Sequence, residues 1–202
     1  TCEIVYHFFK ANGVALTPDI ATCIYAGILA DTGGFVHSNT SVEVFRIAAE
    51  LKALGVDTEF AAKRILGLPS PSAARAIGLA YSRLVIDKES GVMYTWLSSR
   101  ELEEYAATWD EVGMLVNMMN HINAEENAVK CVALFKDKND GMISVSLRSD
   151  PHKGCDVKKL AEHFGGGGHQ YAAAAKIKGT LEEAIAKVLA EAKKIERGPV
   201  VK

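Results

Sequence analysis

Apolar side chains recur three and four positions apart through the first third of the chain, and this period is typical of amphipathic helices. We expect such helices over residues 18–28, 40–54 and 58–66. Thr40 and Glu43 have the spacing of a capping box, so they are expected to begin the second of these helices. The chain also starts in a helical pattern, whose apolar face would consist of Ile4, Val5, Phe8 and Phe9.

The pattern changes beyond residues 67–72, where two prolines and a glycine interrupt the helical period. From there apolar and polar positions alternate in several short runs, which predicts strands. Strands are expected over residues 84–86, 92–97, 128–135, 142–147 and 173–177, and helices over 73–81, 112–122, 157–164 and 181–195. Strands and helices follow one another in both orders, so the predicted fold class is α/β, with helices covering a mixed sheet.

Three regions follow from these patterns. Residues 1–68 are expected to form a helical domain, residues 69–81 a linker with a connecting helix, and residues 82–202 an α/β domain. The first residue is threonine and already lies in a helical pattern, which predicts that the chain is a fragment of a longer protein.

Composition and charge limit the binding partners and the cellular compartment that are expected for this chain. The 202 residues carry a formal net charge of −2, which gives no general attraction for a long nucleic-acid duplex. The four cysteines are scattered without CxxC spacing, which argues against a zinc knuckle or a disulfide framework and favours the reducing cytoplasm. No apolar run approaches the length of a membrane span, so no membrane partner is expected.

Four successive glycines followed by a histidine, Gly165 to His169, are the strongest indication of a site. Glycine adds nothing to a core, and a run of it is tolerated where backbone turns sharply or approaches a ligand. Successive amides without Cβ atoms can converge into an anion-binding nest, and the histidine adds a donor. The alternative is a flexible hinge in which Gly165 caps the preceding helix, but one glycine would serve that purpose.

Two other residues are candidates for phosphate or metal chemistry. Arg148 closes the strand over residues 142–147, where its guanidinium could hold a phosphate bidentately or could simply be solvated. Asp31 opens a glycine turn and could reach a hard cation such as Mn²⁺, or could instead bond the backbone of its own turn. His37, in the same loop, is a weaker candidate.

Three segments together resemble one family, and they are Ala30 to Phe35, Ser146 to Ser149, and Gly166 to His169. They are similar to the Asp-His-His (DHH) phosphoesterases of the nanoRNase and pAp-phosphatase type, which are related to the RecJ exonucleases. The likeness spans nearly the whole chain. It implies that residues 4–66 are the helical rear portion of a DHH catalytic domain, and that residues 82–202 are the smaller, DHH-associated substrate-binding domain.

The resemblance also implies a mechanism and a set of site residues. In the family two Mn²⁺ ions activate water for attack on phosphorus. Asp31 matches the last metal-binding aspartate, whereas the other ligands, including Asp-His-His itself, would precede residue 1, so the chain alone is expected to be inactive. The residues expected to hold the substrate phosphate are Arg148, Ser149, Gly166, Gly167, Gly168 and His169.

The implied substrates are short single-stranded oligoribonucleotides, pAp or linear dinucleotides. Two alternatives stay open: a non-catalytic module that binds nucleotide or phosphate, and a polyphosphate hydrolase, against which base-stacking aromatics such as Phe35 and Tyr171 would argue. The sequence also leaves open whether the protein is a homodimer. It departs from the family in Ala174, where glycine is usual, and in Asp150, whose charge suits an anionic ligand poorly.

Overall fold

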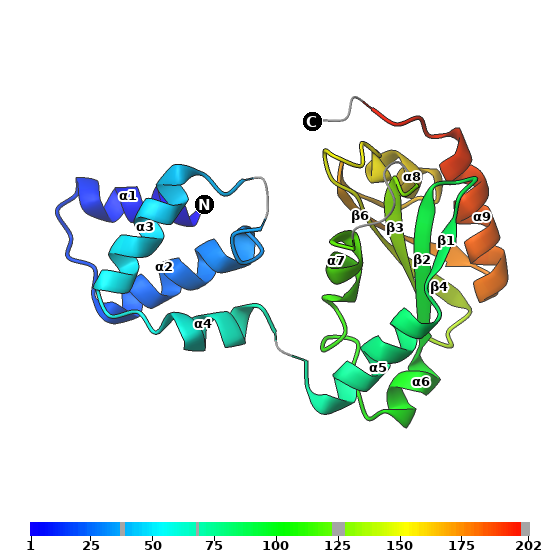
Figure 1. The fold of residues 1–202 in the computed structure, drawn as a ribbon, viewed down its shortest axis with the longest axis horizontal. Coiled ribbons are helices and arrows are strands. Elements are labelled where there is room, and N and C mark those ends of the chain that lie inside the picture. Colours follow the sequence, from blue (N-terminus) through cyan, green and yellow to red (C-terminus); the bar gives the residue numbers. More distant parts are fainter. Residues whose placement is uncertain (37–38, 68, 123–127, 199–202) are drawn as a thin grey trace. The chain divides into compact units, whose positions relative to one another are not determined.

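The structure is a computed structural model that describes residues 1–36, 39–67, 69–122 and 128–198 (Figure 1). It divides into two compact units, Thr1–Leu68 and Pro69–Lys202. None of the helices in the described ranges combines the length and apolar composition that crossing a bilayer requires. The elements are, in chain order, α1 (Cys2–Ala11), α2 (Pro18–Asp31), α3 (Val42–Ala53), α4 (Thr58–Ile65), α5 (Pro71–Ser82), β1 (Val85–Asp87), β2 (Val92–Ser98), α6 (Ser99–Glu104), α7 (Leu115–Asn120), β3 (Cys131–Asp137), β4 (Met142–Arg148), α8 (Val157–His163), β5 (Gly167–His169), β6 (Ala172–Lys178) and α9 (Leu181–Lys194).

The first unit packs α1 to α4 around one apolar core. Helices α2 and α4 begin at side-chain caps, where Thr17 and Asp57 accept hydrogen bonds from the backbone. The capping box predicted at Thr40 is wrong. Ser41 is the N-cap of α3 instead and accepts a hydrogen bond from the amide of Val44 at 3.1 Å.

The apolar face predicted for α1 is also wrong. Ile4 and Phe8 are 73% and 65% exposed, whereas Tyr6 is 2% exposed and lies in the core. The physical reason is the partner helix, because α3 presents carboxylates to α1 rather than an apolar surface. The hydroxyl of Tyr6 donates to Glu50, which also accepts a hydrogen bond from Lys10 at 3.2 Å.

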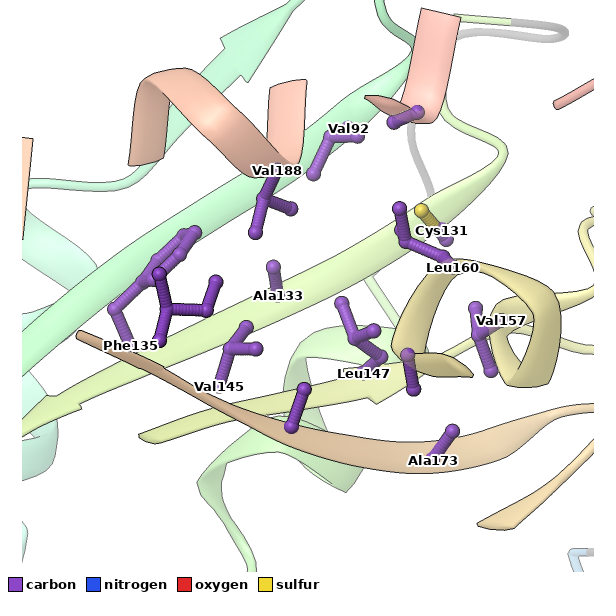
Figure 2. Close-up of a cluster of buried hydrophobic side chains, with 14 of the residues drawn as sticks. Val92, Cys131, Ala133, Phe135, Val145, Leu147, Val157, Leu160, Ala173 and Val188 are labelled. Carbon is purple, nitrogen blue, oxygen red and sulfur yellow. The ribbon is translucent and has the colours of Figure 1, made fainter. Parts of the chain in front are cut away.

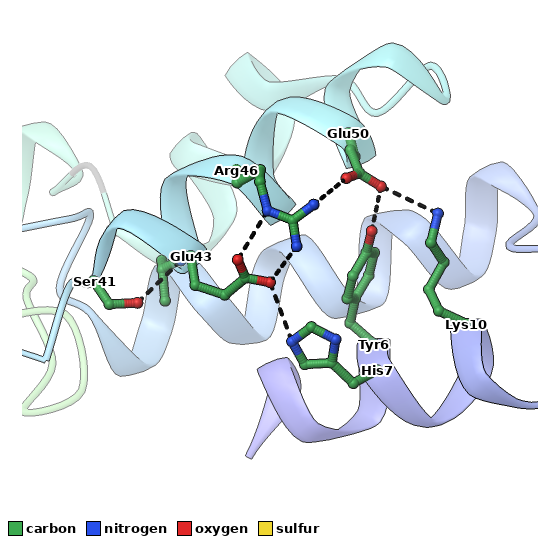
Figure 3. Close-up of polar contacts among 8 residues, drawn as sticks. Tyr6, His7, Lys10, Ser41, Glu43, Arg46 and Glu50 are labelled. Carbon is green, nitrogen blue, oxygen red and sulfur yellow. Dashed lines mark hydrogen bonds and ion pairs between the residues drawn. The ribbon is translucent and has the colours of Figure 1, made fainter.

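This polar contact between α1 and α3 extends along both helices (Figure 3). Arg46 donates to Glu43 through Nε at 2.8 Å and to Glu50 through Nη1 at 3.0 Å, while His7 lies 3.2 Å from Glu43. Hydrogen bonds from Tyr6 and Lys10 hold the pKa of Glu50 below its usual value. Helix α1 is therefore oriented by hydrogen bonds, and its hydrophobic pattern does not reveal the buried side.

The second unit is built on a six-stranded sheet in the order β1-β2-β3-β4-β6-β5. Strands β2 and β3 are parallel and all other neighbours are antiparallel, so the sheet is mixed and the predicted α/β fold class is confirmed. A capping box of Ser98 and Glu101 begins α6, and Asp156 caps α8. Helix α7 is shorter than the helix predicted over residues 112–122.

One face of this sheet is covered across β3, β4 and β6. Side chains that alternate along β3, β4 and β6 point under α8 and α9 and form a dry core (Figure 2). The residues of β4 and β6 on this covered face are Ile143, Val145, Leu147, Ala173, Ala175 and Ile177. Small alanines on β6 allow α8 to pack closely on the strand.

The opposite face is covered over only part of its width. Helices α5, α6 and α7 pack on Met93 and Leu97 of β2 and on Val132 and Leu134 of β3, forming a second core. Beyond β3 the residues on this side of β4 and β6 are half-buried or exposed. The uncovered part of the sheet is where the candidate site lies.

Candidate functional site

Arg148 and His169 lie in one row across the sheet. Arg148 ends β4, His169 ends the edge strand β5, and the start of β6 lies between them. Arg148 pairs with Ala172 on β6, and Ala172 pairs in turn with His169 on β5. Residues directly opposite one another in antiparallel strands have side chains on the same face. The guanidinium and the imidazole therefore lie on one side of the sheet, with a small methyl group between them.

This side of β4, β6 and β5 is called the open face below. Period-two alternation places polar or small residues on it, opposite the apolar residues of the covered face. Its side chains are half-buried or exposed, and His169 is exposed. The residues of the open face are Ser144, Ser146, Arg148, Ala172, Ala174, Lys176, Gly167 and His169.

The glycine run differs from the predicted turn, because most of it is a strand. Gly165, with φ of +71°, ends α8, and Gly167–His169 form β5 against β6. A Cβ atom on Gly166 or Gly168 would lie 2.2 Å or 2.5 Å from a carbonyl oxygen of β6. The close approach that requires glycine is therefore an approach to backbone.

The predicted anion-binding nest is wrong for the first part of the run. The amides of Gly165 and Gly166 donate to the carbonyl oxygens of Glu162 and Ala161 in α8, at 3.0 Å and 2.9 Å. These two amides are therefore unavailable to a ligand. Ligand contacts by Gly166, Gly167 and Gly168 stay a prediction.

Arg148 is held by neutral partners only. Its Nε donates to Oδ1 of Asn117 at 2.8 Å, and its Nη1 donates to the carbonyl oxygen of Leu147 at 2.9 Å. Within the described residues no carboxylate forms an ion pair with it, and burial lowers its pKa. Sequence reasoning missed Asn117, although a polar residue amid the apolar side chains of α7 was an available indication.

Ser149 does not join the open face. Its side chain is 4% exposed, its hydroxyl donates to the carbonyl oxygen of Lys130 at 2.8 Å, and it accepts from the amide of Cys155 at 3.3 Å. The residue after the strand end thus turns inward and ties β4 to β3. Its predicted contact with substrate finds no support in this placement.

The charge of Asp150 is compensated locally. Its carboxylate accepts hydrogen bonds from the amides of His152 and Lys153 at 2.9 Å and 2.8 Å, and from Nζ of Lys153 at 2.6 Å. Burial raises the pKa of Asp150, but the bonds from Lys153 outweigh this, and the net pKa is lowered. Asp150 therefore organises the turn after β4, and its charge is neutralised by Lys153.

A groove of about 460 Å³ continues the open face away from Arg148. Lys136 pairs with Ser144, which pairs with Lys176, so two lysines flank a serine in one row. Burial, reinforced by the charges of Lys138 and Arg148, lowers the pKa of Lys136. An anion in this groove would relieve that repulsion. The residues that line it include Lys136, Ser144, Ser146, Gly165, Gly166 and Lys176.

Asp31 lies at the end of α2 in the first unit, beside a hollow of about 380 Å³. Its Oδ2 accepts a hydrogen bond from Asn39 at 3.2 Å. The turn that follows is fixed by three successive residues with positive φ, ending at Phe35, whose ring stacks on Phe45. His37 lies outside the described residues.

The described residues do not by themselves fit a metal ion. Among them there is no cluster of three or more histidine, cysteine, aspartate or glutamate side chains that could hold one. Asp31 contributes a single exposed carboxylate at a helix end, and one carboxylate is not a metal site by itself.

Comparison with known proteins identifies the family. Residues 89–197 match the family described as DHHA1 domain. This stretch is more than half of the chain, so the chain belongs to the DHHA1 domain family.

Relatives extend the likeness through the first unit. The bifunctional oligoribonuclease and PAP phosphatase NrnA of Thermus thermophilus is 34% identical over 94% of this chain, and that of Bacillus subtilis is 26% identical over 87%. The alignments take in 55% and 54% of those proteins, so the chain spans about half the length of the curated relatives it matches. The resemblance to DHH phosphoesterases of the nanoRNase and pAp-phosphatase type is thereby confirmed.

A solved structure agrees on the fold. The crystal structure of an exopolyphosphatase-related protein from Bacteroides fragilis has a TM-score of 0.83 and 28% identity to this chain. It covers 96% of this chain, and the chain covers 55% of it.

Proposed function

We propose that the chain is part of a manganese-dependent phosphoesterase and that its open face captures a phosphate of short oligoribonucleotides, pAp or linear dinucleotides. The observation that carries this proposal is the row of Arg148 and His169 on an uncovered sheet face. The relatives named oligoribonuclease and PAP phosphatase support the substrate class. The proposed compartment is the cytoplasm.

The chemistry of capture follows from the contacts of Arg148. With its Nε and one Nη1 donor used, the Nη2 group has no partner within the described residues. It can donate to a phosphate oxygen in a charge-assisted hydrogen bond, and the exposed imidazole one strand away can donate from the other side. Further phosphates of a short strand would lie over the groove with Lys136 and Lys176.

Asp31 has a separate role in this proposal. It would supply one carboxylate toward Mn²⁺, and a bound Mn²⁺ would supply Lewis-acid chemistry for activating water. The remaining ligands would come from the part of the relatives' length that this chain does not span. Since one carboxylate is far from a complete site, the 202 residues alone are expected to bind nucleotide without hydrolysing it.

Steady-state kinetics with a dinucleotide separate the two roles in the protein that carries this chain. Arg148→Ala and His169→Ala should raise KM, by about tenfold or more for the arginine, because a charge-assisted bond is lost. Asp31→Asn should depress kcat instead. Arg100→Ala is the control, since that arginine lies on α6 and is exposed. Unchanged KM for both Arg148→Ala and His169→Ala would refute capture at the open face.

Polyphosphate hydrolysis is a second candidate, favoured by the likeness to an exopolyphosphatase-related protein and by the lysines of the groove. Phe35 is already stacked on Phe45, which weakens its candidacy as a base-stacking residue. Parallel assays of phosphate release from pAp and from polyphosphate distinguish the candidates. Preference for pAp is the expected result.

A further inference from the structure

The contact between α7 and the end of β4 assigns a second residue to phosphate capture. Asn117 is half-buried on α7, and its Oδ1 lies 2.8 Å from Nε of Arg148. Every N–H of a guanidinium is a donor, so the oxygen of the amide must face it. The other end of the amide lies 3.7 Å from the sulfur of Met114, a weak acceptor.

From this geometry we propose that Asn117 is the positioning residue of Arg148, and that it orients the guanidinium without neutralising its charge. The inference rests on the proposed function of the open face. A neutral acceptor fixes the plane of the guanidinium through Nε and leaves the positive charge available to an anion. A carboxylate in the same place would form an ion pair with Arg148 and compete with phosphate for it.

Two observations support the choice of a neutral acceptor. The nearest carboxylate along the chain, Asp150, bonds Lys153 and not Arg148. The carbonyl oxygen of Leu147, which is also neutral, accepts the second bond from the guanidinium. Arg148 is thus half-buried, held in place at two nitrogen atoms and uncompensated within the described residues.

The test is calorimetric binding of adenosine 5′-monophosphate to the 202-residue chain. Asn117→Ala removes the acceptor, and Asn117→Asp keeps the shape and the acceptor but adds a charge. Both should weaken binding, by about fivefold to tenfold, for different reasons. Thermal unfolding distinguishes a positioning role from a merely structural one, because the melting temperature of Asn117→Asp should be no lower than that of the native chain.

Met118→Glu is the matched control. It adds the same charge at the neighbouring position of α7, where the side chain is 40% exposed. Among the described residues, the hydrogen bonds of Arg148 go to Asn117 and Leu147. Binding within about twofold of the native chain is expected, because a solvent-exposed charge interacts only weakly with its neighbours. An equal loss in Met118→Glu and Asn117→Asp would overturn the proposal, since general repulsion would then explain both.

Arg148→Ala distinguishes this inference from the function on which it rests. If Arg148→Ala loses binding while Asn117→Ala and Asn117→Asp bind normally, Asn117 has no positioning role and capture by Arg148 stands. If Arg148→Ala itself binds normally, capture at the open face is refuted, and the role of Asn117 with it.

Discussion

The covered face and the open face of the second unit are built from the same strands but hold different chemistry. Along β4, Val145 and Leu147 lie in the dry core under α8 and α9, whereas Ser146 and Arg148 lie on the other side. The two faces share one backbone, so alternate residues of a strand lie either in the apolar core or on the open face, where binding is proposed. Substitutions at neighbouring positions of one strand should therefore differ in their effects on stability and on binding.

The largest expected effect on the free energy of unfolding comes from truncating a buried side chain of the covered face. Leu147→Ala leaves a cavity in a fully buried core and should lower the free energy of unfolding by about 3 kcal/mol. Ser146→Ala, one residue away on the open face, should change it by less than about 0.5 kcal/mol. Urea denaturation measures both. Similar losses for the two variants would show that the open face is packed as a core.

A smaller loss of unfolding free energy is expected from substitutions where the glycine run packs against β6. Gly166→Ala would place a methyl group against the carbonyl oxygen of Ala174 and push β5 away, at a cost of about 2 kcal/mol. Gly167→Ala is the control, because its Cβ would meet nothing within 4 Å. Denaturant titrations of both variants test this difference. Equal stability would mean that the run tolerates side chains and that close approach does not explain its composition.

The smallest effect concerns the turn that follows β4. Asp150→Asn removes the charge that Lys153 compensates and should cost about 1 kcal/mol at pH 7. The folded-state pKa of Asp150 is lowered, so its contribution is present above the ordinary aspartate pKa of about 3.9 and is lost as the pH falls below it. Unfolding free energies of both proteins should therefore converge as the pH falls below about 3.9 and through the lowered folded-state pKa.

Asp140→Asn is the control for that experiment, because among the described residues its carboxylate accepts only the amide of Met142. Its difference from the native chain should be smaller at pH 7. A pH-independent difference for Asp150→Asn would contradict the role of its charge.

Strand alternation and helix caps in the second unit were predictable from the sequence, because interactions between nearby residues determine them. Alternation along β4 and β6 and the caps of α6 and α8 depend on residues close in sequence. Arg148 and His169 were expected at one pocket, and the structure places them in one row.

Other features depend on partners distant in sequence and could not be predicted in this way. The buried side of α1 is decided by Glu50, more than 40 residues away. Gly167–His169 became a strand because β6 offered an unpaired edge. Ser149 turned inward toward Lys130, and Asn117 met Arg148 only through the packing of α7 on the sheet.

The most direct test of the central claim is an NMR titration of the 202-residue chain with adenosine 5′-monophosphate. Capture at the open face predicts that the largest amide shift changes occur at Arg148, at His169 and at Ala172 between them, with residues of α1 to α4 unaffected. Shift changes confined to the first unit, or none at millimolar nucleotide, would contradict it.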